Sequence, residues 1–163
     1  MKNLLLLLLL LLLSPAAFAQ AWTQKGKTWI HNNGLSVTFP GEYLVKPDKN
    51  GFLNATASGG TVNLVFTPVK GKEQMKGAMK GIFQTMQAAK VDLKPDTQSG
   101  KQNGLDVAFQ EGSTVMNTVP IYVKLGIFSK KEKDTYLLMQ LIVPEKELEG
   151  HQASIASVTA SIK

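Results

Sequence analysis

Histidine is the side chain best suited to proton transfer near neutral pH, and this chain has two. His151 lies between Leu148 and Ile155 of an apolar helical stripe, so we expect either a ring packed at the core boundary or a ligand in a pocket under that helix. His31 lies beside the turn Asn33-Gly34, where we expect an exposed and inert side chain. Neither histidine has a second histidine or a carboxylate at metal-ligand spacing, so the sequence does not support a zinc site.

Nucleophilic catalysis has no recognisable motif in this chain. Ser113 lacks the glycine-flanked elbow of a hydrolase, and the run that begins at Ser154 lacks the lysine of a Ser-x-x-Lys motif. The twelve acidic residues are scattered at turns and helix ends, which leaves a hidden acid/base pair as an open alternative. The sequence therefore favours a protein that is not an enzyme and that holds no cofactor or metal.

The best candidate surface lies on an amphipathic helix that we predict over residues 72–90. Its apolar residues recur at helical spacing, whereas Gly77 and Gly81 fall nearly opposite Met75 and Met86 on a helical wheel. Two glycines in a helix interior cost about 1 kcal/mol each relative to alanine, and the close approach of another surface would justify that cost. We therefore predict a docking face for an acidic partner or an anionic surface, with a merely solvated helix as the alternative. The predicted face comprises Lys72, Lys76, Gly77, Lys80 and Gly81.

The same helix also supports a second function, that of a carrier for a small apolar ligand. Methionine side chains are flexible and polarisable, so they suit an adaptable lining between this first helix and the sheet. The simpler alternative is that these side chains fill the core. The residues of the candidate pocket are Met75, Met79, Phe83, Met86, Met139 and His151.

These candidates must be positioned by strands and by a second helix over residues 145–162. Alternating apolar and polar residues predict the strands, and the residues between 92 and 104 read as a polar loop. The run 135–143 is apolar on both faces, which is typical of a strand in the middle of a sheet that is covered on both sides. The predicted strands cover residues 28–31, 35–39, 43–46, 52–58, 61–67, 105–109, 119–128 and 135–143.

The composition excludes several classes of function and stabilisation. All eighteen basic residues are lysines, and the formal net charge is +6. Arginine supplies the bidentate contacts by which proteins read nucleic-acid bases, so we expect no nucleic-acid partner. The chain has no cysteine, so an apolar core rather than disulfide bonds must stabilise it.

The first nineteen residues have the pattern of a cleaved secretion signal. Lys2 precedes ten consecutive leucines, and the small-x-small run Ala17-Phe18-Ala19 follows. Ten residues of helix span about 15 Å, roughly half of a bilayer's hydrocarbon core. We expect a soluble exported protein of the bacterial periplasm or exterior, not a lipoprotein, that begins at Gln20, with cleavage after Ala21 as the near alternative. Residues 20–27 would form a flexible leader and residues 28–163 a single domain.

Particular residues indicate the order of the predicted elements: hairpins, a helix, long antiparallel strands and a C-terminal helix. They are Gly34 to Pro40, the helix after Thr67-Pro68, the strand Gly104 to Phe109, and the ending that contains Tyr136, Pro144, Ile155 and Ile162. This pattern resembles the Mog1/PsbP-like proteins, and among them the bacterial exported DcrB-like and DUF1795 proteins.

The resemblance implies an α+β fold, an α/β/α sandwich whose mainly antiparallel sheet is covered by two principal helices. It also implies an accessory or binding protein that acts through contact with another envelope protein and has at most peripheral electrostatic contact with a membrane. No catalytic motif defines this group, so the resemblance implies no site residue.

Overall fold

The computed structural model describes residues 22–163, and the predicted secretion signal lies outside the described residues. A seven-stranded antiparallel sheet has the strand order β4-β5-β6-β10-β9-β8-β7, and a small sheet has the order β1-β2-β3. The strands are β1 (Trp22–Lys25), β2 (Thr28–His31), β3 (Ser36–Thr38), β4 (Tyr43–Pro47), β5 (Leu53–Ala57), β6 (Asn63–Lys70), β7 (Asp92–Gln102), β8 (Leu105–Met116), β9 (Val119–Lys130) and β10 (Thr135–Pro144).

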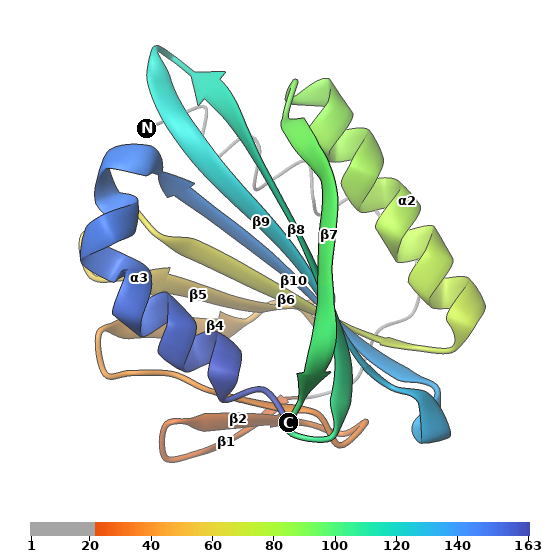
Figure 1. Ribbon diagram of the computed structural model, residues 1–163. Coiled ribbons are helices and arrows are strands. Elements are labelled where there is room, and N and C mark those ends of the chain that lie inside the picture. The colour runs from red at the N-terminus through yellow and green to blue at the C-terminus, as the bar shows by residue number, and fades with distance from the viewer. Residues whose placement is uncertain (1–21) are drawn as a thin grey trace.

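Two helices cover opposite faces of the large sheet, as Figure 1 shows. They are α2 (Lys72–Ala88) and α3 (Glu145–Ala160), and a single 3-10 turn (Lys131–Lys133) joins β9 to β10. This arrangement confirms the predicted α+β sandwich and both predicted helices. No helix among residues 22–163 is long and apolar enough to span a membrane.

Strand β10 separates two hydrophobic cores. Leu137, Met139 and Leu141 belong to the core under α3, whereas Leu138 and Ile142 belong to the core under α2. This division follows from the alternation of side chains along a strand. The predicted central position of this strand is confirmed, because β10 is the fourth of seven strands.

The predicted loop between residues 92 and 104 is wrong, because β7 occupies most of it and forms one edge of the large sheet. Nearly all of its side chains are exposed, so the strand lacks the apolar alternation that sequence analysis detects. Its backbone pairs with β8 from Thr97↔Gln110 to Gln102↔Leu105, after an irregularity between Leu93 and Thr97. Backbone pairing with an apolar neighbour, rather than its own side chains, makes this segment a strand.

The predicted flexible leader is also wrong over Trp22–Lys25, which forms β1 and pairs with β2. The Trp22 side chain is 8 % exposed and belongs to the core under α3. Its indole N–H donates a hydrogen bond to the Gly51 carbonyl at 2.9 Å. One large aromatic side chain therefore fixes a segment that is otherwise polar.

His31 is buried rather than exposed, which corrects a further expectation. Its side chain is 2 % exposed, and its ring lies 5.0 Å from the Trp22 ring, centroid to centroid. The Asn33 backbone N–H donates to its Nδ1 atom at 3.2 Å. The hairpin turn exposes its neighbours, but β1 covers the histidine.

Replacement of Trp22 by alanine tests the role of the N-terminal strand. We expect Trp22→Ala to lower the free energy of unfolding by about 3–5 kcal/mol, because it removes a buried aromatic side chain and its hydrogen bond. Urea unfolding followed by circular dichroism measures the loss. Thr23→Ala, an exposed change in the same strand, is the control and should shift stability by less than about 0.5 kcal/mol. Equal unfolding midpoints for the two variants would contradict the assigned packing of β1.

Candidate functional site

Helix α2 is attached to the sheet by a small number of buried contacts. It begins after Gly71, whose φ of 92° favours glycine, and no side chain among the described residues caps its N-terminus. Ile82 and Met86 are the two buried residues of this 17-residue helix. The Thr114 hydroxyl donates a hydrogen bond to the Ala89 carbonyl at 3.0 Å, just beyond the C-terminal end of the helix.

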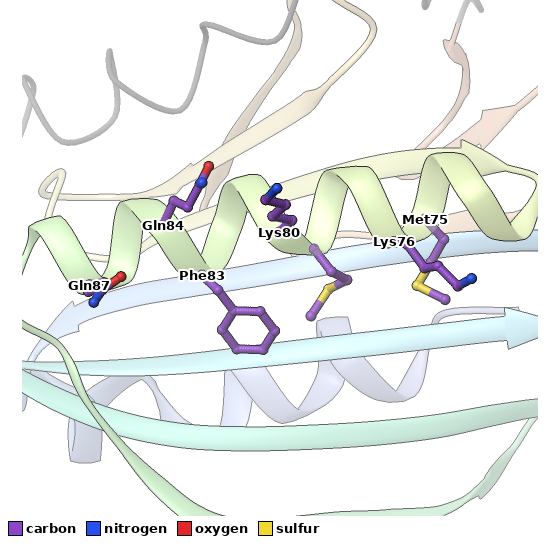
Figure 2. A pocket seen from close by; sticks show the side chains of 7 residues that line it. Met75, Lys76, Lys80, Phe83, Gln84 and Gln87 are labelled. Atoms are coloured by element: carbon purple, nitrogen blue, oxygen red, sulfur yellow. The ribbon is translucent and has the colours of Figure 1, made fainter.

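A largely apolar, open groove with a volume of about 540 Å³ runs along one flank of α2. Figure 2 shows the side chains that line it. The side chain of Phe83 is 41 % exposed and projects from the side of the helix. Met75 and Met79 are partly buried and pack against the core under α2. The lining consists of Met75, Lys76, Met79, Lys80, Phe83, Gln84 and Gln87.

The structure places the predicted docking residues on the exposed side of α2. Lys72 and Lys80 are exposed, and Lys76 forms an exposed ion pair with Glu73 at 2.8 Å. A Cβ atom built on Gly77 or Gly81 would meet no heavy atom within 4 Å, so the glycines face open space. Lys76 and Lys80 line the same groove as Met75, Met79 and Phe83. Some residues predicted for docking and some predicted for ligand binding therefore lie together.

The six residues of the predicted pocket do not form one site. Met75, Met79 and Phe83 line the groove, and Met86 is buried beneath α2. Met139 faces the opposite core, where the Thr159 hydroxyl lies 4.0 Å from its sulfur. His151 belongs to α3, on that opposite side. Met139 and His151 are therefore separated from the groove by the sheet.

Sequence analysis missed an ionic cluster on the face of the sheet that α3 covers. Glu111 lies directly across from Lys124, and Lys124 Nζ is 3.2 Å from Glu111 Oε1 and 4.9 Å from the centre of the Phe109 ring. Lys94 Nζ adds a longer contact to Glu111 Oε2 at 3.7 Å. The alternation of apolar and polar residues along β8 and β9 can be seen in the sequence. Only the register between the two strands shows that Glu111 and Lys124 lie side by side.

The cluster keeps its carboxylate charged at neutral pH. A hydrogen bond from the Tyr122 hydroxyl lowers the pKa of Glu111, and Lys124 lowers it further against the effect of partial burial. Burial, followed by that hydrogen bond, raises the pKa of Tyr122. A carboxylate held in this state is unsuited to donating a proton. Among residues 22–163 no group of three histidine, cysteine or acidic side chains is placed to hold a metal ion.

Replacement of the α2 glycines by alanine tests whether their outer side is open. We expect Gly77→Ala and Gly81→Ala each to raise the free energy of unfolding by about 1 kcal/mol, because alanine is the better helix former and meets no neighbour. Urea unfolding measures both. Gly112→Ala is the contrasting control, since its Cβ would lie 2.6 Å from the Asp92 carbonyl oxygen. Destabilisation by Gly77→Ala would refute the open face.

Removal of the Tyr122 hydroxyl tests the ionic cluster. In Tyr122→Phe we expect the pKa of Glu111 to rise, because its largest stabilising hydrogen bond is lost. A carboxyl group whose pKa is lowered in the folded state stabilises the fold above about pH 4, and this stabilisation is lost as the pH falls. The free energy of unfolding of the variant should therefore rise less than that of the unmodified protein as the pH is raised through this range. Carbon-13 NMR titration of the glutamate carboxyl groups measures the pKa. Tyr136→Phe, which removes a hydrogen bond to Asp134 instead, should leave Glu111 unchanged.

Comparison by sequence identifies no relative for this chain. No protein-family model matches it. No curated protein matches it either. The comparison with solved structures is therefore the one that bears on the fold.

Several solved structures share its architecture at low sequence identity. The solution structure of cyanobacterial PsbP from Synechocystis has a TM-score of 0.58 at 10 % identity, over 93 % of this chain and 98 % of the other. LpqN of Mycobacterium tuberculosis, described as involved in cell envelope biogenesis, has a TM-score of 0.56 at 9 % identity, over 88 % and 89 %. The Ran-binding protein Mog1p of Saccharomyces cerevisiae has a TM-score of 0.52 at 8 % identity, over 86 % and 96 %.

One further match concerns a longer protein. A Bacteroides thetaiotaomicron structure has a TM-score of 0.57 at 15 % identity over 86 % of this chain, which spans 48 % of that protein. At these identities the matches establish the arrangement of helices and strands, in agreement with the resemblance inferred from sequence. Seven antiparallel strands between two helices, matched to PsbP, LpqN and Mog1p along most of their lengths, give this chain the Mog1/PsbP-like fold.

Proposed function

We propose that this protein is an exported, non-enzymatic accessory protein of the bacterial envelope that binds another envelope protein through the groove side of α2. The observation that carries the proposal is the exposed Phe83 ring in an apolar groove beside Lys76 and Lys80. Aromatic side chains, including phenylalanine, are enriched in the buried centres of protein interfaces.

The apolar part of this surface supplies binding energy. Complete burial of a phenylalanine side chain contributes about 1.5–3 kcal/mol relative to full exposure, and 41 % of Phe83 remains to be buried. Gly77 and Gly81 add a strip without side chains next to the groove, where a partner's backbone can approach closely. The two glycines then serve the interface rather than the stability of the helix.

The charged part of this surface selects the partner. Lys72, Lys76 and Lys80 are exposed on α2, and among residues 22–163 no carboxylate forms an ion pair with Lys80. A partner with an acidic surface would gain in association rate and would bind less tightly at high salt. We therefore assign the groove to an acidic protein segment that carries an apolar anchor.

The placement in the envelope rests on the N-terminal sequence, and the structural comparisons support the class of function. The secretion-signal pattern of residues 1–19 favours export. LpqN is described as involved in cell envelope biogenesis, and Mog1p as Ran-binding, so this fold serves an envelope role in one protein and a binding role in another.

Filling the glycine strip tests the docking function. The partner is first identified by photo-crosslinking in the native envelope. A photo-crosslinking amino acid at position 76 or 80 should capture one protein that the same amino acid at position 146 of α3 does not capture. In Gly77→Leu with Gly81→Leu we expect the purified partner to bind at least tenfold more weakly, because the new side chains occupy the contact. Isothermal titration calorimetry measures the affinity.

Gly150→Leu is the matched control, because Gly150 also lies in a helix and meets no atom within 4 Å of a built Cβ. It should bind the partner as the unmodified protein does. Circular dichroism should show all variants folded, since both glycine positions on α2 are open. Unchanged partner binding by the double variant would refute the docking function.

A further inference from the structure

Strand β4 forms one edge of the large sheet, and among residues 22–163 no strand pairs with its outer side. Leu44, in the middle of this strand, is 63 % exposed. Its neighbours Tyr43 and Val45 contact the core under α3, so Leu44 points to the opposite face of the sheet, on which α2 lies (Figure 1). An unpaired strand edge is a template for pairing with a further strand.

The direction of the backbone groups of β4 follows from one hydrogen bond. The Ser58 N–H donates to the Glu42 carbonyl at 2.8 Å, which continues the register between β4 and β5. Hydrogen-bonded and non-hydrogen-bonded residues alternate along an antiparallel pair, so Leu44, like Glu42, points its backbone groups towards β5. Tyr43 and Val45 therefore point theirs towards the open edge.

Three of these outward backbone groups are free to bind another strand. The Tyr43 N–H donates to the Pro40 carbonyl at 3.3 Å. No turn, loop or side-chain hydrogen bond among residues 22–163 uses the Tyr43 carbonyl, the Val45 N–H or the Val45 carbonyl. Pro47, the last residue of β4, has no N–H, so pairing along this edge is short.

The side chains of this edge complement those of a second copy. An antiparallel strand pair with a two-fold axis places one residue directly opposite its own copy. With Leu44 opposite itself, Glu42 of each copy lies opposite Lys46 of the other, and these side chains share one face. The Val45 N–H of each copy then faces the free Tyr43 carbonyl of the other.

The neighbouring registers lose this match. With Val45 opposite itself, Leu44 would lie opposite the charged Lys46. With Tyr43 opposite itself, Leu44 would lie opposite the charged Glu42. The register about Leu44 is therefore the one in which apolar side chains meet and opposite charges face each other.

We propose that two copies of this chain pair antiparallel through β4, with Leu44 at the two-fold axis. The two leucine side chains meet at the centre, and a Glu42–Lys46 pair lies on each side of them. Opposite charges that face each other across two strands stabilise the pairing. The two seven-stranded sheets become one continuous sheet.

This dimer gives the groove of α2 a bivalent arrangement. The two-fold axis is perpendicular to the joined sheet, so both copies of α2 lie on the same face of it. A partner with two acidic segments of matching spacing would bind more tightly than a partner with one. This consequence rests on the proposed docking function, whereas the dimer itself does not.

An introduced cysteine tests the two-fold axis, because the chain has no cysteine of its own. We expect Leu44→Cys to form a disulfide-linked dimer on mild oxidation, since directly opposite residues lie within the Cα separation that a disulfide spans, about 4.4–6.8 Å. Non-reducing gel electrophoresis at low protein concentration measures the linked fraction. Val115→Cys, at a position of β8 that is 67 % exposed, is the matched control and should stay monomeric.

Exchange of the charges tests the register. Sedimentation velocity should show a dimer of the unmodified protein that forms as its concentration rises. Glu42→Lys and Lys46→Glu should each dimerise at least tenfold more weakly, because each places like charges opposite each other. An equimolar mixture of the two variants should dimerise again, because each lysine of one copy then faces a glutamate of the other. Lys133→Glu, an equal change of charge in the turn between β9 and β10, should leave dimerisation unchanged.

Several results would overturn the β4 dimer. These are a monomer at every protein concentration, linkage of Val115→Cys as extensive as that of Leu44→Cys, or a mixture of the two charge variants that stays monomeric. Gly77→Leu with Gly81→Leu should leave the dimer intact, because both glycines lie on α2. Failure of partner docking and failure of the dimer are therefore separately observable.

Discussion

Burial of β10 on both faces is the constraint on which the rest of the structure depends. Leu137, Met139 and Leu141 require cover on one side, and Leu138 and Ile142 require it on the other. A strand with two apolar faces is stable where neighbouring strands pair with both of its edges and helices cover both of its faces. Strands β6 and β9 supply the pairing, and α2 and α3 supply the cover.

The two covers are not equivalent, and the difference bears on function. The core under α3 is closed further by the small sheet, through Trp22 and Val37, and by backbone hydrogen bonds between Ser36 and Lys163. The core under α2 is smaller, although each helix buries two of its own residues. Elements with few buried contacts open at the lowest free-energy cost, and binding regions are commonly drawn from them. The smaller core, which the small sheet does not cover, is consistent with the docking role that we propose for α2.

The fold satisfies some polar side-chain atoms of the interior, and it leaves four without a hydrogen-bond partner among the described residues. Glu111 has Tyr122 and Lys124 as partners, and Trp22 reaches the Gly51 carbonyl. The Oε1 atom of Gln140 has no such partner among the described residues. Buried polar atoms are normally paired, so each of these four unpaired atoms lowers the stability of the fold.

The sequence by itself determined both helices and the central position of β10, because each follows from a local pattern of apolar residues. The class of fold followed from the resemblance in the order of these elements. It did not predict β1 or β7, whose side chains are mostly exposed and whose backbones become strands by pairing with distant neighbours. It identified the lysine and methionine flank of α2 but placed Met139 with it. Which face of β10 lies under which helix depends on the path of the chain between elements. Only the tertiary structure therefore separated Met139 from the groove and brought Gln140 beneath α2.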